Sequence, residues 1–134
     1  MYKIIIEIPF RAGHRLLPPY KGKCNNVHGE GYTAIIEFTS DKLDENGMVL
    51  DFGKIKKQVK EWIDENWDHT YICHYKDSIA QILMNEHMRV FTMDNNPTAE
   101  NMAKYLFTKM EAIGNVTKVG IVESFRDSIA WYEN

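Results

Sequence analysis

Two apolar segments set the strongest constraint on how this chain can fold. Residues 2–8 (YKIIIEI) and 32–39 (YTAIIEFT) are rich in β-branched and aromatic residues, which favour β-strands. Both segments are apolar on the two faces of a strand, so both faces of the sheet that they form must be covered. Helices can cover one face. We expect further copies of the chain to cover the other, which predicts a homo-oligomer.

The spacing of apolar residues changes after Asp51. Apolar side chains then recur at steps of three and four residues, which predicts an amphipathic helix. These residues are Phe52, Ile55, Val59, Trp62, Ile63 and Trp67. A second main helix is predicted after Pro97, with Thr98 as its N-cap, and it is expected to run to about Gly114. Residues 77–87 predict a shorter helix.

The remaining segments complete a single domain over residues 1–134. Pro9 and Gly13 are expected to end the first strand. Residues 89–93 predict a short extended piece, and residues 116–124 and 127–134 predict two terminal strands. Strands that are grouped apart from helices indicate the α+β class, with an antiparallel sheet that carries helices on one face.

Charge and composition exclude several classes of protein. The net charge is −3, and Lys and Arg form no one-sided block, which argues against a nucleic-acid partner. No apolar run approaches the roughly 20 residues that span a bilayer. The N-terminus lacks a signal-peptide pattern, so we expect a cytoplasmic protein with no membrane partner. In that reducing compartment, Cys24 and Cys73 are expected to be free thiols.

Three polar residues near the ends of the first two strands predict a metal site. His28 and Glu30 are two residues apart, so in an extended segment they point to the same side. Pairing of the first two strands brings His14 to the same end of the sheet. Two imidazoles and a carboxylate with an open fourth position form a known catalytic zinc arrangement. The alternative is that these are surface loop residues with no shared partner.

Four further side chains are candidates for chemistry or binding. Cys24 precedes His28 by one short turn, and a nearby dication would favour its thiolate; otherwise it is an inert loop cysteine. Asp68 can orient His69 for proton transfer, although a histidine after a helix can also interact with the helix dipole. Glu123 ends an apolar strand, where it either faces water or binds a ligand rich in N–H groups. His74 and His87 have no companion at metal-ligand spacing and are expected to be surface residues.

Taken in order, six short motifs resemble the 6-pyruvoyl-tetrahydropterin synthase family, which includes the 6-carboxytetrahydropterin synthases of queuosine biosynthesis. The motifs are FRAGH (10–14), CNNVHGE (24–30), LDF (50–52), DH (68–69), PTAEN (97–101) and ES (123–124). The resemblance implies the tunnelling fold, in which an antiparallel four-stranded sheet carries two helices on one face. It also implies that three subunits join their sheets into a barrel and that two trimers stack into a hexamer.

The resemblance also implies roles for individual residues. His14 and His28 match zinc ligands, and Cys24 matches the base that removes a proton from the substrate side chain. Asp68 and His69 match the pair that handles the second proton, and they can serve a neighbouring subunit's metal because sites of this family lie between subunits. Glu123 and Thr98 match residues that contact the pterin ring.

Two departures from the family pattern stand out. Glu30 replaces the third imidazole of the usual H-G-H string. A His2Glu site still suits zinc, but the carboxylate lowers the net charge of the site from +2 to +1 and can favour another divalent metal. Residues 73–96 separate two of the motifs, and we expect them to form a surface insertion near the mouth of the site.

The function expected from this resemblance is a zinc-dependent lyase acting on 7,8-dihydroneopterin triphosphate. Carbon–carbon cleavage would give 6-carboxytetrahydropterin, and triphosphate elimination would give the 6-pyruvoyl product. Cleavage like that of dihydroneopterin aldolase is a third reaction of the same class. The alternative outside enzymes is a pterin- or purine-binding module with a degenerate metal site. Arg126, Arg15 and Lys23 are candidates for the triphosphate by charge alone.

Overall fold

The first two strands form one long antiparallel ladder in the computed structural model, which describes all of residues 1–134. Strand β1 (Tyr2–His14) pairs with β2 (His28–Ser40) over its whole length. Both strands were predicted, but the expectation that Pro9 and Gly13 end the first one is wrong. The other edge of β1 has a strand neighbour only from Ala12 to His14, and an open edge is where a sheet tolerates proline.

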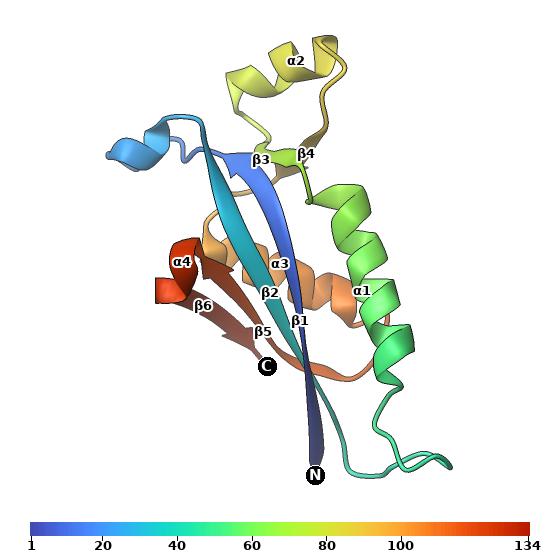
Figure 1. The fold of residues 1–134 in the computed structure, drawn as a ribbon. Coiled ribbons are helices and arrows are strands. Elements are labelled where there is room, and N and C mark those ends of the chain that lie inside the picture. Colours follow the sequence, from blue (N-terminus) through green and yellow to red (C-terminus); the bar gives the residue numbers. More distant parts are fainter.

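The sheet is larger than the four antiparallel strands that the resemblance implied. Its order is β4-β3-β1-β2-β5-β6, as Figure 1 shows. Strands β5 (Val116–Glu123) and β6 (Ser128–Glu133) continue the antiparallel run from β2, as predicted. Strands β3 (Thr70–His74) and β4 (Val90–Met93) extend the other side in parallel. The α+β class is therefore confirmed, but the sheet has six strands and is mixed.

Two main helices cover one face of the sheet. Helix α1 (Phe52–Asn66) begins at Asp51, whose carboxylate accepts a hydrogen bond from the Lys54 N–H at 3.0 Å. Helix α3 (Ala99–Met110) begins at Thr98, whose hydroxyl oxygen accepts one from the Asn101 N–H at 3.2 Å, so the predicted N-cap is confirmed. The remaining helical pieces are η1 (Lys23–Asn25), α2 (Ser78–Asn85) and the short α4 (Ser124–Asp127).

The core lies between the helices and alternate residues of the strands. In β1, Ile6, Ile8 and Phe10 are buried, whereas Ile5 on the opposite face is 54% exposed. Of the apolar residues predicted to line one face of α1, Ile55, Val59 and Ile63 join the core, whereas Phe52 is 53% exposed. Helix α3 contributes Met102, Leu106 and Met110 to the same core. None of the helices combines the length and the apolar character that crossing a bilayer requires.

The segment 73–96 is part of the sheet, which corrects its description as a surface insertion. It contains the end of β3, helix α2 and strand β4, and Cys73 and Met93 are buried. Both cysteines are free, as expected. Figure 1 shows α2 at the end of the sheet where β1 ends. The expected surface positions of His74 and His87 hold in part, because His87 is exposed and His74 is half-buried.

One buried ion pair fastens this unit to β1. Arg15, the residue after β1, donates to both carboxylate oxygens of Asp77, at 3.0 and 2.6 Å. The Tyr71 hydroxyl and the Ile79 N–H also donate to Asp77, which caps α2 and is fully buried. Burial acts to raise the pKa of Asp77, but these three donors outweigh it and hold the pKa below its ordinary value.

We predict that Asp77→Ala lowers the free energy of unfolding by about 3 kcal/mol at pH 7, because it leaves Arg15 and Tyr71 without a partner. A depressed pKa stabilises the folded state above the unfolded value, near pH 4, and this contribution is lost as the pH falls through the folded value. The gap between wild type and variant should therefore shrink in acid. Urea denaturation at several pH values measures it.

Asp64→Ala is the matched control. It removes the exposed pair between Lys60 and Asp64 on α1, which should change the free energy of unfolding by less than about 1 kcal/mol. Equal losses in the two variants, or a gap that grows in acid, would contradict this account of Asp77.

Candidate metal centre and active site

The register of β1 and β2 brings the predicted metal ligands together. His14 lies directly opposite His28, and Ala12 lies opposite Glu30. Since paired residues and alternate residues of a ladder share a face, His14, His28 and Glu30 point to the same side. Their potential ligand atoms all lie within 4.8 Å of one another. The predicted convergence is therefore confirmed, and all three residues belong to strands rather than to surface loops.

Backbone carbonyls determine which imidazole nitrogens are free. The Nδ1 atom of His14 lies 3.0 Å from the Pro97 carbonyl oxygen, and the Nδ1 atom of His28 lies 2.7 Å from that of Asn26. A carbonyl oxygen only accepts, so each Nδ1 carries a proton, and in a neutral ring the lone pair is then on Nε2. An imidazole that is oriented in this way is the usual form of a histidine ligand to a metal.

Glu30 uses its two carboxylate oxygens differently. Its Oε1 lies 3.3 Å from the Nε2 of His28, and its Oε2 accepts a hydrogen bond from the Ser124 hydroxyl at 2.5 Å. The backbone of Ser124 has a φ of 40°, a left-handed value that residues other than glycine rarely adopt. Ser124, in the segment between β5 and β6, thus holds one carboxylate oxygen of Glu30, while the other oxygen faces the imidazoles. Sequence reasoning had assigned no role to Ser124.

The electrostatics of the cluster suit a cation. His14 is buried, and burial is the main cause that lowers its pKa. The hydrogen bond with the Pro97 carbonyl acts to raise this pKa, His28 lowers it, and Glu30 acts to raise it. A lowered pKa keeps the imidazole neutral, which is the form that binds metal. Two neutral imidazoles and one carboxylate are a donor set that zinc accepts. The residues present therefore fit the metal that was expected.

Glu123 lies beside this cluster on the same face. It pairs with Tyr32 in the sheet, one step along β2 from Glu30 on that face. Burial raises the pKa of Glu123, and repulsion from Glu30 and Glu100 raises it further, whereas His28 acts to lower it. A half-buried carboxylate whose charge is disfavoured in this way is stabilised by N–H donors.

Cys24 and Thr98 do not belong to the three-residue cluster. Cys24 is half-buried in η1, and its carbonyl oxygen accepts from the Leu16 N–H at 2.7 Å. A hydrogen bond with the Cys24 thiol is the main cause that raises the pKa of Tyr20. The pKa of Tyr32 is raised first by burial, then by Glu123 and Glu30, and last by Cys24. Cys24 is not one of the three gathered ligands. Thr98 follows Pro97, whose carbonyl oxygen orients His14.

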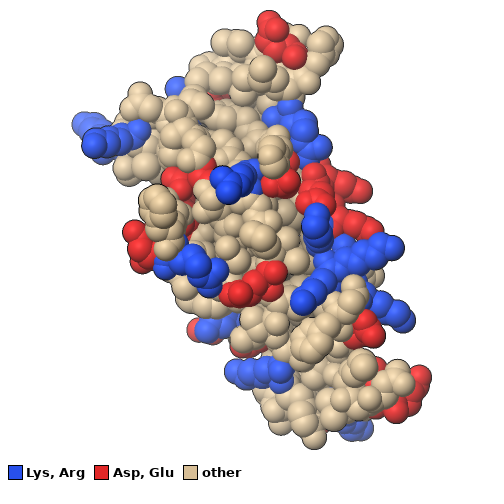
Figure 2. Space-filling model, in the orientation of Figure 1, with Lys and Arg blue, Asp and Glu red and all other residues tan.

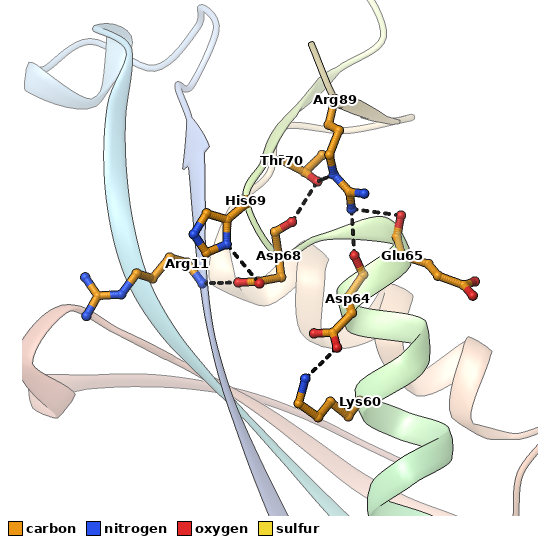
Figure 3. Close-up of polar contacts among 8 residues, drawn as sticks. All are labelled: Arg11, Lys60, Asp64, Glu65, Asp68, His69, Thr70 and Arg89. Carbon is orange, nitrogen blue, oxygen red and sulfur yellow. Dashed lines mark hydrogen bonds and ion pairs between the residues drawn. The ribbon is translucent and has the colours of Figure 1, made fainter.

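Asp68 and His69 form the expected carboxylate–imidazole pair, drawn in Figure 3. The Nδ1 atom of His69 lies 2.9 Å from Oδ2 of Asp68, and Oδ1 accepts the Arg11 N–H at 2.9 Å. Burial acts to raise the pKa of Asp68, but the Arg11 N–H and the His69 imidazole outweigh it and hold the pKa below its ordinary value. The His69 side chain is 76% exposed.

The pair does not lie beside the two histidine ligands of its own chain. Arg11 and His14 are three residues apart on β1, so they point to opposite faces of the sheet. A cleft of about 760 Å³ holds Arg11, Asp68, His69 and Arg126, and it reaches Glu30, but His14 and His28 do not line it. Figure 2 shows this face, where acidic and basic side chains surround an uncharged centre.

The three cations considered for a triphosphate have different surroundings. Arg15 forms an ion pair with Asp77. Arg126 lines the cleft, where its guanidinium lies 3.3 Å from Glu7. Lys23 lies in η1. Arg11, which sequence reasoning did not consider, lines the same cleft as Arg126.

Comparisons with known proteins point to one family. The profile of the family described as 6-pyruvoyl tetrahydropterin synthase matches residues 3–134. A protein named 6-carboxy-5,6,7,8-tetrahydropterin synthase from Rickettsia conorii is 44% identical over 108 residues, which cover 79% of this chain and 78% of that protein. A protein of the same name from Haemophilus influenzae is 31% identical over 118 residues, covering 83% of each.

The fold gives the same result. The structure of Caenorhabditis elegans 6-pyruvoyl tetrahydropterin synthase matches with a TM-score of 0.73 and 26% identity, covering 99% of this chain and 95% of that chain. The profile match spans nearly the whole length, and each motif behind the resemblance lies within it. The chain belongs to the 6-pyruvoyl tetrahydropterin synthase family.

Proposed function

We propose that this chain is a zinc-dependent lyase that converts 7,8-dihydroneopterin triphosphate into 6-carboxytetrahydropterin, a step of queuosine biosynthesis. The convergence of His14, His28 and Glu30 at one end of the sheet carries the proposal. The names of the most similar relatives support this product over the 6-pyruvoyl one. The proposal includes a cytoplasmic location, where Cys24 stays reduced and forms no disulfide.

The residues that would hold the metal are His14 and His28 through Nε2 and Glu30 through Oε1. When bound, zinc would polarise the side-chain hydroxyls of the substrate and make the neighbouring C–H bonds more acidic. The Ser124 hydroxyl would keep the second oxygen of Glu30 turned away from the metal. Glu30 would also make the site less positive than three imidazoles would, so another divalent metal is a candidate as well.

The proton transfers would fall to Cys24 and to the Asp68–His69 pair. Cys24 would accept the first proton as a thiolate. In the pair, Nδ1 of His69 donates to Asp68, so Nε2 is free to accept or donate the second proton at the exposed edge of the ring. Asp68 would hold the ring in that tautomer and stabilise its charged form.

The pterin ring would bind through Glu123 and Thr98. The N–H groups of the ring would supply the donors that the half-buried Glu123 carboxylate requires. The Thr98 oxygen accepts the Asn101 N–H, and its own O–H remains available to donate to the ring.

We further propose that the complete site lies between subunits of a trimer or hexamer. The sheet separates the pair from the histidine ligands of its own chain, so the pair would serve a neighbour's metal. The face of the sheet away from the helices also leaves Ile5, Ile129 and Trp131 between 43% and 54% exposed. Exposed apolar side chains on a sheet face are typical of a surface that another subunit covers.

Incubation of the zinc-loaded protein with 7,8-dihydroneopterin triphosphate tests the reaction, with products identified by mass spectrometry. We expect 6-carboxytetrahydropterin, and with it the other two side-chain carbons and the triphosphate as released products. The 6-pyruvoyl product would assign the alternative lyase reaction. Unchanged substrate with every divalent metal, in protein that still binds the pterin, would overturn the proposal in favour of a binding module.

Metal binding tests the ligand set separately. We expect about one zinc per chain by elemental analysis. Residues that only support metal ligands contribute about 10- to 100-fold in affinity, so Ser124→Ala should weaken zinc binding by about tenfold and Glu30→Ala by about 100-fold or more. Competition with a chelator measures both. His87→Ala, which removes an exposed histidine elsewhere, should leave the affinity unchanged, and equal losses in all three variants would count against the assignment.

Glu30→His tests what the carboxylate does. If Glu30 weakens the activation of the substrate by making the site less positive, the imidazole should raise turnover several-fold while one zinc per chain remains bound. Steady-state kinetics on proteins of equal zinc content measure the effect. Lower turnover in the fully loaded variant would show that the chemistry depends on the carboxylate itself.

A further inference from the structure

Arg89, immediately before β4, reaches back to the end of α1. Its Nη2 atom donates to the carbonyl oxygens of Asp64 at 2.6 Å and Glu65 at 3.0 Å. Its Nε atom donates to the Thr70 hydroxyl oxygen at 3.1 Å. Figure 3 shows the guanidinium between the last turn of α1 and the first residue of β3. The proposed function uses none of these contacts.

The two carbonyls are groups that a helix leaves without partners. Asp64 and Glu65 lie in the last turn of α1, where carbonyl oxygens lack an N–H from a following turn and the helix dipole favours a cation. That turn contains no basic residue of its own, so Arg89 supplies the positive charge from another element. A planar guanidinium can bond two carbonyls and a hydroxyl together, which a lysine ammonium does less well.

The same contacts enclose the turn that carries the carboxylate–imidazole pair. The Thr70 hydroxyl donates to the Asp68 carbonyl oxygen at 3.1 Å, and the Arg89 carbonyl oxygen accepts the Tyr71 N–H at 3.0 Å. Arg89 therefore holds the chain on both sides of His69. His69 itself has a φ of 55°, a left-handed value that persists only where surrounding contacts impose it.

We propose that Arg89 is a positioning residue for the Asp68–His69 pair. It acts through Thr70 and the end of α1, and it fixes the left-handed turn that aims the His69 imidazole into the cleft. The inference rests on the proposed role of the pair in proton transfer. It also gives the segment 73–96 a part in catalysis, because that segment supplies Arg89.

Arg89→Met tests the proposal, since it keeps an unbranched, flexible stem and removes every donor. A displacement of about 1 Å at a catalytic group can cost about 100-fold in rate, so we expect kcat to fall by roughly 10- to 100-fold. KM and the zinc content per chain should stay the same. Arg89→Lys should restore little, because one ammonium cannot replace the three contacts. Thr70→Val, which removes the hydroxyl that links the Arg89 guanidinium to the Asp68 carbonyl, should lower kcat in the same way.

Two control variants separate positioning from general stability. Asn115→Ala removes hydrogen bonds to Thr39 in a part of the fold away from the pair, so it should lower Tm without changing kcat. Lys57→Met removes the exposed ion pair with Glu61 on α1 and should change neither. If Arg89→Met lowers Tm like Asn115→Ala and leaves kcat unchanged, Arg89 is only structural.

An NMR readout keeps the inference separate from the proposed reaction. The imidazole signals of His69 can be followed in the metal-free protein without any substrate. In Arg89→Met and Thr70→Val, they should move toward their positions in Asp68→Asn, where the carboxylate partner is lost. Unmoved signals would overturn the inference even if the lyase activity is established. Moved signals would support it even if the wild type does not turn over the pterin.

Discussion

The pairing of β1 with β2 is the interaction on which the rest of the structure depends. The ladder runs without a break from the Tyr2–Ser40 pair to the His14–His28 pair. A slip of one residue would turn every side chain of one strand to the other face, because side chains alternate along a strand. The same slip would expose Ile6 and Ile8 and would separate His14 from His28 and Glu30. Core packing and the candidate metal centre therefore require the same register.

Elements distant in the sequence then supply the contacts that hold the candidate site residues. The carbonyl of Pro97, before α3, sets the tautomer of His14. The turn between β5 and β6 supplies Ser124 for Glu30 across 94 residues of sequence. On the other face, Arg89 reaches the turn that carries His69. Each of these contacts holds a candidate site residue, or the turn that carries one, through a group with no proposed part in the chemistry. In this respect the site depends on the whole fold.

The outline of the fold and the convergence of His14, His28 and Glu30 were predictable because they depend on local patterns. The steps of three and four residues in α1 and the cap at Thr98 follow from short-range physics, and so does the common face of His28 and Glu30. Strand β3 was missed because Thr70–His74 follows the Asp68–His69 turn directly, with no glycine or proline between helix and strand. Its burial comes from parallel neighbours, which local alternation does not reveal.

The parts of the site that were missed are long-range. The bond between Ser124 and Glu30 requires the register of β2 with β5, which no local pattern specifies. The position of the Asp68–His69 pair on the face opposite to His14 requires β3 to lie beside β1. Pro9 was expected to end a strand because the open edge beside it could not be known. In each case a tertiary neighbour decided the outcome.

Anomalous diffraction at the zinc absorption edge, from crystals of the zinc-loaded protein, tests the central claim most directly. The account predicts one peak per chain at about 2.0–2.2 Å from Nε2 of His14, Nε2 of His28 and Oε1 of Glu30. A peak elsewhere, or imidazoles with no ion between them and Glu30 turned only to Ser124, would contradict it.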